Sequence, residues 1–232
     1  MAISGNIFKS GKSNSTSGND DVVGRFRSGF QDDSGNPVGL SAWRATTSDN
    51  VVAESLAAVL KASEDVSEWE TKSGEIYQVF GSMDTVDIVL DSPSSVRATL
   101  VLWSNKGGKI MESDGEYLIE EGKLTSKPDP DAGLPLKERK EKARQGIGPG
   151  PSLQAYFRLA DAPDLGKFKF FSAAWTAIEN FSDAELDLGA HDGPCRATLR
   201  LEVVEWEDKK TGQLNSFTRP EIVVVGPVEE GF

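Results

Sequence analysis

The chain has 232 residues, with 25 Lys or Arg against 37 Asp or Glu, and its formal net charge at neutral pH is -12. Its 38% hydrophobic and 27% charged residues are typical of a globular protein of one large or two small domains, which excludes a fibrous or a long disordered chain. The acidic balance disfavours broad binding to phosphate backbones, the single Cys195 excludes an intrachain disulfide, and the single His191 is too little for a histidine-based metal site.

Residues 1–21 are rich in Ser, Gly and Asn and are expected to form a mobile leader without a secretory signal. After them, VVGRFRSGF and LSAWRATT predict two strands of a hairpin around a polar turn. A helix is predicted over residues 50–62, because Val52, Leu56 and Leu60 recur at helical spacing and Asp49 can cap the first turn.

Further strands are predicted in EIYQVFGS, TVDIVL and VRATLVLW, and a second hairpin in KIMES and EYLIEE. Residues 122–151 have Pro and Gly at both ends and predict a linker that contains one polar helix. Nearly all of the remaining sequence is strand-like, including GKFKFFSAAWTA, AELDLGA and SFTRPEIVVVG, and CRATLRLEVV alternates apolar with polar residues as a half-buried strand does.

Short segments recur in the same order in both halves of the chain. Phe26-Arg27, Trp43 and Arg97-Ala98-Thr99-Leu100 correspond to Phe157-Arg158, Trp175 and Arg196-Ala197-Thr198-Leu199. The predicted fold is therefore α+β, predominantly β, with two related β-rich lobes at residues 22–121 and 152–232, the helix in the first, and the linker between them. Chance similarity between strand-rich segments is the alternative.

No motif indicates catalysis. The sequence has no phosphate-binding loop, no nucleophile elbow and no set of Cys and His metal ligands, so we expect no catalytic residue, no metal and no cofactor. Paired carboxylates such as Asp129 and Asp131 are plentiful, but in so acidic a chain they are typical of solvated surface. An enzyme with an unfamiliar carboxylate site stays open as an alternative.

The aromatic and arginine residues are better explained by protein recognition than by catalysis, because Trp and Arg dominate the energetics of interfaces. Arg25 and Arg27 share one strand face and Phe26 points to the other. The candidate partner-binding residues are Arg25, Arg27, Trp43, Arg44, Trp69 and Trp103. The basic segment LPLKERKEKARQ supplies candidates for contact with DNA or with a partner, namely Arg139, Lys140 and Arg144.

The order VGRFR, LSAWRATT, the helix with Val52-Ala53 and Leu56-Ala57, EWET, and Val96 to Trp103 resembles the recombination directionality factors of actinophages that use large serine integrases. The resemblance covers residues 22–120 well. It implies a non-enzymatic protein that binds the coiled-coil region in the C-terminal domain of the integrase and switches it from integration to prophage excision. DNA would then be contacted indirectly, through the integrase, in the cytoplasm of the bacterial host, without a membrane.

A second function stays open, since β-rich domains with Trp and Arg also form stacking platforms for nucleic acids. On that interpretation the chain is a phage single-stranded-DNA-binding or replication accessory protein with an oligonucleotide-binding barrel.

Overall fold

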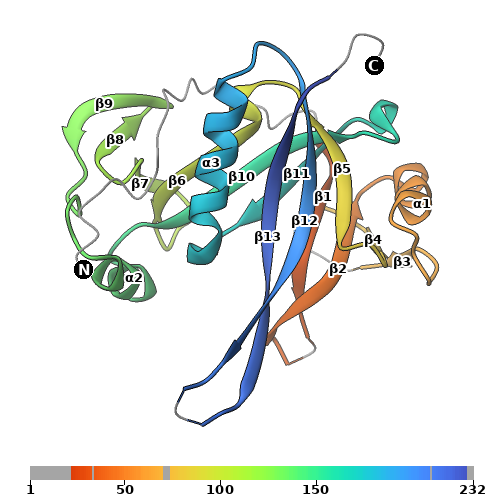
Figure 1. Ribbon diagram of the computed structural model, residues 1–232, viewed down its shortest axis with the longest axis horizontal. Helices are drawn as coiled ribbons and strands as arrows, with labels where there is room; N and C mark the ends of the chain where they lie inside the picture. The colour runs from red at the N-terminus through yellow and green to blue at the C-terminus, as the bar shows by residue number, and fades with distance from the viewer. Residues whose placement is uncertain (1–21, 33, 70–73, 210, 229–232) are drawn as a thin grey trace. The chain divides into compact units, whose positions relative to one another are not determined.

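The computed structural model describes residues 22–32, 34–69, 74–209 and 211–228. It is predominantly β, which confirms the predicted fold class (Figure 1). The chain divides into two compact units. Unit 1 comprises Ser92–Ala155 and Phe171–Gly193, and the described part of unit 2 comprises residues 22–91, Tyr156–Phe170 and 194–228.

Unit 1 is a meander of antiparallel strands in the order β10-β6-β7-β8-β9. Helix α3 packs on β6 through Ile178, Phe181, Ala184 and Leu188, which are buried at helical spacing. The elements are η1 (Pro93–Ser95), β6 (Val96–Trp103), β7 (Lys109–Ser113), β8 (Tyr117–Glu120), β9 (Lys123–Pro128), α2 (Leu136–Arg144), the first part of β10 (Gly150–Leu159), η3 (Trp175–Ala177) and α3 (Ile178–Gly189).

Two predictions change in this unit. AELDLGA is part of α3 and not a strand, because the residues that it buries repeat every three or four positions, whereas Leu186 is exposed. Residues 122–151 contain the predicted polar helix as α2, but the rest of the segment forms β9 and the start of β10 within the compact unit.

Unit 2 is a longer sheet in the order β3-β4-β2-β1-β11-β10, in which β10 also pairs with β5, β5 with β12, and β12 with β13. Strands β1 and β2 form the predicted hairpin, and β1 runs parallel to β11. The elements are β1 (Val22–Gln31), β2 (Pro37–Thr47), α1 (Asn50–Val59), β3 (Ser67–Glu68), β4 (Tyr77–Phe80), β5 (Thr85–Leu90), η2 (Pro163–Leu165), β11 (Lys167–Ser172), β12 (Cys195–Glu207) and β13 (Leu214–Pro227).

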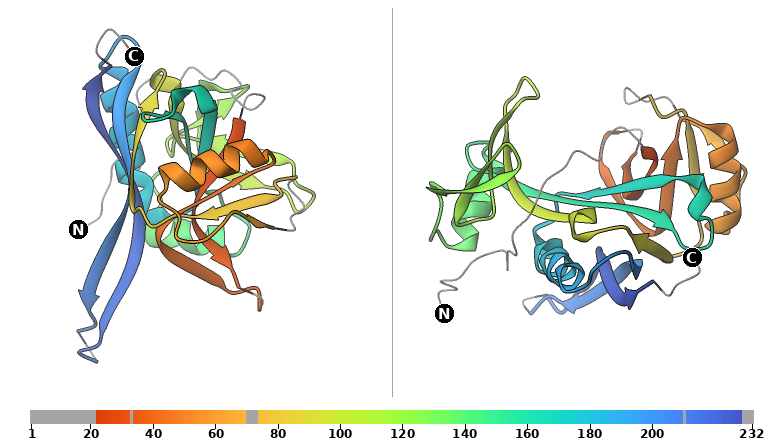
Figure 2. Two further views of the ribbon diagram at one scale, coloured as in Figure 1. Left: turned by 90° about the vertical axis from the view of Figure 1, so that its right-hand side faces the viewer. Right: turned by 90° about the horizontal axis from the view of Figure 1, so that it is seen from above.

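Helix α1 confirms the sequence prediction. Asp49 accepts hydrogen bonds from the N–H groups of Val51 and Val52 and so caps the helix. Ala53 and Leu56 are buried, and Leu60 follows them into the core just beyond the last turn. The helix lies against β2 and β4 (Figure 2).

The strands of unit 2 curve around an aromatic core. The backbone N–H of Trp43 in β2 donates to Met83 O at 2.8 Å, just before β5, so β2, β1, β11, β10 and β5 nearly close on themselves. Trp43 is fully buried, and its indole N–H donates to Leu199 O at 3.2 Å. The Trp43 ring pairs with those of Phe26 and Phe170 at 6.0 and 5.3 Å, and the rings of Phe26, Phe157 and Phe168 pair with one another at 5.3 to 6.3 Å.

The proposed internal repeat has a limited structural counterpart. Phe26 and Phe157 both enter this core, while Arg27 and Arg158 point outward and pair with Glu75 and Asp91. Trp175, in contrast, lies in η3 and is partly exposed. Because β5, the end of β10 and β12 pair together, unit 2 draws on both halves of the chain, and the compact units do not coincide with lobes at 22–121 and 152–232. The predicted leader at residues 1–21 lies outside the described residues.

Strand β13 pairs with β12 and with no other described strand. Its central residue opposite Leu201 is Pro220. Because the Leu201 N–H donates to Asp84 O, on the side away from β13, this is a non-hydrogen-bonded pair, and the Pro220 nitrogen faces away from β12.

Candidate protein-binding face

Four of the predicted partner-binding residues lie together on the outer side of β1, β2 and β4. The register places Arg25 opposite Thr46 and Arg27 opposite Arg44, and β4 lies on the other side of β2. Trp69 follows β3 and stacks over the two arginines at 27 and 44. We call the set of Arg25, Arg27, Arg44, Trp69 and Glu75 the arginine–tryptophan face.

Glu75 forms ion pairs with both arginines that β1 contributes to this face. Its carboxylate lies 3.1 Å from Arg25 Nε and 2.6 Å from Arg27 Nη2, and it also accepts a hydrogen bond from the Thr46 hydroxyl at 3.0 Å. Glu75 is only 8% exposed, whereas the Arg25 side chain is 46% exposed. The expectation that Arg25 and Arg27 share a face opposite the buried Phe26 is confirmed, and both arginines pair with the same carboxylate.

Arg44 is enclosed between aromatic rings. Its guanidinium carbon lies 4.3 Å from the centroid of Trp69 and 5.2 Å from that of Phe80, and Nη2 donates to Gln78 Oε1 at 2.6 Å. Burial, and to a smaller extent the Arg27 cation, lower the pKa of Arg44 to about 10, and Glu75 opposes this shift. Arg44 therefore stays charged at neutral pH although its residue is only 2% exposed.

The face carries three guanidinium groups and one carboxylate, so it has two positive charges in excess on a chain whose net charge is -12. Ion pairs and ring stacking fix these side chains before any partner arrives. Such preorganisation reduces the entropy lost on binding.

Two of the other predicted residues lie elsewhere. Trp43 is a core residue of unit 2, and with 0% exposure it cannot contact a partner. Trp103 lies at the end of β6 in unit 1 and is 53% exposed, so it remains available for contact but does not join the arginine–tryptophan face.

The candidates from the basic segment separate on α2. Arg139 is 3% exposed and is bound internally, with Nη1 at 3.3 Å from Asp129 Oδ2 and Nη2 donating to Gly115 O at 2.8 Å. It is therefore a structural residue, because the Asp129 carboxylate that neutralises it is itself buried. The expectation that Asp129 and Asp131 lie on solvated surface is wrong, since they are 2% and 3% exposed. Lys140 and Arg144 are exposed, and Arg144 pairs with Glu141.

Sequence reasoning missed Glu75, Gln78 and Phe80. The alternation of EIYQVF indicates that Gln78 and Phe80 share a face of one strand. Glu75 lies 48 residues from Arg27, and only the pairing of β1, β2 and β4 brings the two together.

The described residues contain no group of three or more His, Cys, Asp or Glu side chains that could hold a metal ion. Cys195 is buried at the start of β12, and burial raises the pKa of its thiol, which agrees with an inert structural cysteine. No helix in the described ranges is long and apolar enough to cross a membrane.

Comparison with known proteins agrees with the resemblance found in the sequence. A family model described as Gp3-like, recombination directionality factor-like, matches residues 23–225, which include both units and the arginine–tryptophan face. No solved structure matches the chain. Because the family model spans most of its length, this chain belongs to the recombination directionality factor-like family.

Proposed function

We propose that this chain binds a phage large serine integrase, at the coiled-coil region of its C-terminal domain, and switches it from integration to excision of the prophage from hybrid sites. The chain would act without catalysis of its own, in the cytoplasm of the bacterial host, and would reach DNA through the integrase. Family membership supports a role in recombination. The arrangement of Arg44 between Trp69 and Phe80, beside the arginines held by Glu75, supports recognition of a protein.

The physical basis is a difference in binding free energy. A factor that binds one arrangement of the integrase more tightly than another shifts the population toward that arrangement. A 100-fold shift requires about 2.7 kcal/mol of differential binding. One partly buried Trp with its arginine neighbours is a sufficient source, since truncating such an interface residue costs about 2 kcal/mol or more.

The test uses purified integrase and measures both complex formation and recombination of hybrid sites. Trp69→Ala should weaken the complex at least about tenfold, and Trp69→Phe, which keeps a ring over Arg44, should retain most of the affinity. Arg25→Gln removes an exposed charge without placing a new carboxylate beside Glu75, and Lys127→Gln on β9 is its matched control. Unchanged excision by folded Trp69→Ala and Arg25→Gln proteins would remove the face from this proposal.

Direct nucleic-acid binding is the second candidate, and the exposed stripe of α2 favours it. Lys137, Lys140 and Arg144 line one shallow hollow at helical spacing, together with Leu136 and Glu141. This function predicts salt-sensitive binding of oligonucleotides without integrase, weakened by Lys140→Gln. The integrase-binding function predicts a shift of DNA in a gel only when integrase is present.

A further inference from the structure

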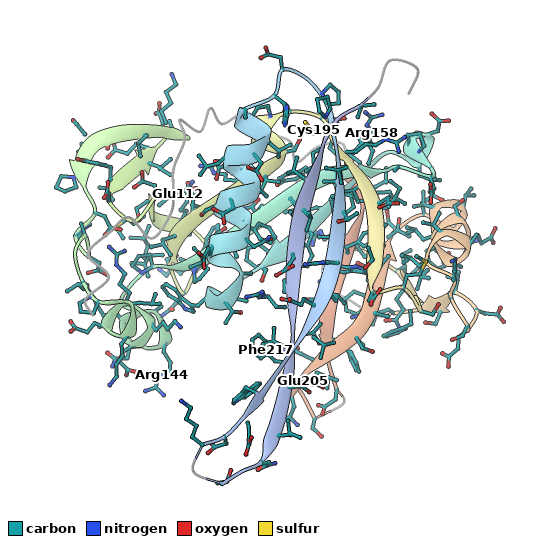
Figure 3. The ribbon with its side chains drawn as sticks, viewed as in Figure 1. Glu112, Arg144, Arg158, Cys195, Glu205 and Phe217 are labelled. Atoms are coloured by element: carbon teal, nitrogen blue, oxygen red, sulfur yellow. The ribbon has the colours of Figure 1, made fainter. Side chains whose placement is uncertain are left out.

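The end of the β12–β13 hairpin extends beyond the sheet that supports it. Residues Cys195–Arg200 of β12 pair with β5 on one side and with β13 on the other, whereas Glu202–Glu207 pair only with β13 (Figure 1). We call the described residues of 202–219 the arm. Figure 3 labels Glu205 and Phe217 on the arm, away from Cys195 at the start of β12.

One face of the arm stabilises the ribbon itself. Trp206 and Phe217 pack edge to face with centroids 5.6 Å apart, across the two strands. At the base of the same face Arg219 bridges Glu202 and Glu221, and Arg200 binds Glu221 at 2.7 Å. A two-stranded ribbon is marginally stable alone, and these contacts reinforce it.

The opposite face presents exposed side chains. The register places Val203, Glu205 and Glu207 on this face of β12, with Leu214 opposite Glu207. Val203 is 54% exposed and Leu214 is 76% exposed. Among the described residues, neither the Glu205 nor the Glu207 carboxylate has a hydrogen-bond or ion-pair partner.

This uncovered face continues the core side of the strand. Ala197, Leu199 and Leu201 occupy the same face of β12 and are buried in unit 2. Beyond Leu201, Val203 continues this apolar alternation, and the next two residues on the same face are Glu205 and Glu207. The strand therefore continues the apolar pattern of its buried part into a part that is exposed. Exposed apolar residues of this kind are typical of docking surfaces.

The charge of this face indicates which class of partner can bind to it. Its two carboxylates disfavour DNA, and they would repel a second copy of so acidic a chain. An α-helix with an apolar stripe and basic residues complements both features. Val203 and Leu214 are four residue steps apart along the ribbon, about 13 Å, which corresponds to about eight or nine residues of helix.

We propose that the arm docks a basic amphipathic helix on its Val203–Leu214 face. Apolar residues of the helix, about eight positions apart, contact Val203 and Leu214, and Lys or Arg residues between and beside them pair with Glu205 and Glu207. The proposal rests on the proposed function in one respect: the helix belongs to the partner integrase. The arm is a second surface, distinct in charge from the arginine–tryptophan face.

Purified integrase of the same phage is the probe, and its affinity for the chain is measured by calorimetry at two salt concentrations. The double variant Val203→Ser, Leu214→Ser should weaken binding at least about tenfold. Val51→Ser on α1 and Val225→Ser near the end of β13, with 68% and 69% exposure, are matched controls and should bind as the wild type does. The double variant Glu205→Lys, Glu207→Lys should weaken binding most at low salt.

Hydrogen exchange of the complex identifies the occupant. Protection of residues 202–219 together with an integrase helix of the stated pattern supports the proposal. Protection of a strand or loop of the integrase overturns it, as do normal affinities of both arm variants when circular dichroism shows them folded. Arm-dependent binding of duplex DNA alone, or arm-dependent dimerisation in sedimentation, also overturns it. If the wild-type chain neither binds integrase nor changes its choice of sites, the proposed function fails instead.

Discussion

Glu185 gives a sharp test of the electrostatics of unit 1. Its carboxylate on α3 accepts a hydrogen bond from the Ala98 N–H of β6 at 3.3 Å. Burial raises its pKa from 4.5 to about 7, although this hydrogen bond and the Arg97 cation favour the ionised form. Because the folded protein binds a proton more tightly than the unfolded chain, the free energy of unfolding falls as the pH rises from 4.5 to about 7.

The expected size follows from the two pKa values. The two pKa values differ by about 2.5, and one pKa unit corresponds to about 1.36 kcal/mol. The free energy of unfolding is therefore lower by about 3 kcal/mol above pH 7. Glu185→Gln keeps a hydrogen-bond acceptor for Ala98 and cannot ionise. It should therefore raise the free energy of unfolding by about 2 to 3 kcal/mol at pH 8 and by less than about 0.5 kcal/mol at pH 4.5.

Urea denaturation followed by tryptophan fluorescence at both pH values measures this effect. Glu64→Gln, at an exposed position of unit 2, is the control and should change stability by less than about 0.5 kcal/mol at either pH. An equal gain for Glu185→Gln at the two pH values would show that packing causes it. No gain at pH 8 would refute the buried, proton-binding carboxylate.

Three further predictions concern stability and reactivity. Arg139→Ala leaves the buried Asp129 carboxylate unpaired and should cost about 3 to 5 kcal/mol in urea denaturation, whereas a comparable loss for the exposed Lys140→Ala would contradict this distinction. Gly81→Ala should lower the melting temperature, because a Cβ there would lie 2.7 Å from Leu60 Cβ and 2.9 Å from Trp43 O, while Gly39→Ala meets nothing within 4 Å and serves as control. Cys195 should react with an aromatic disulfide reagent only after unfolding, and rapid labelling of the native protein would be inconsistent with its burial.

The sequence predicts an element correctly where the residues of its buried face recur at the regular spacing of a helix or a strand. Asp49, Leu56 and Leu60 specify both the cap and the inner face of α1, and the alternation in CRATLRLEVV specifies the orientation of β12. α3 was missed because Ala184, Leu186 and Leu188 also alternate. Only the sheet behind the helix decides that Ala184 and Leu188 are buried while Leu186 faces outward.

The candidate site divides in the same way. The shared face of Arg25 and Arg27 follows from strand geometry and could be predicted. The burial of Trp43 and the pairing of Arg27 with Glu75 depend on strands distant in sequence, as does the internal ion pair of Arg139. The arm could not be predicted, because its extension beyond β5 depends on how far β5 reaches.

Pro220 affects how readily the edge of strand β13 can pair with a second chain in a concentrated solution of the protein. An unpaired edge of β13's length would act as a template on which a second chain could grow a continuous intermolecular sheet. The proline nitrogen carries no hydrogen where it faces outward, so such growth is interrupted at the middle of the strand. The missing N–H donor therefore disfavours intermolecular pairing along a strand that also exposes Val223 and Val225.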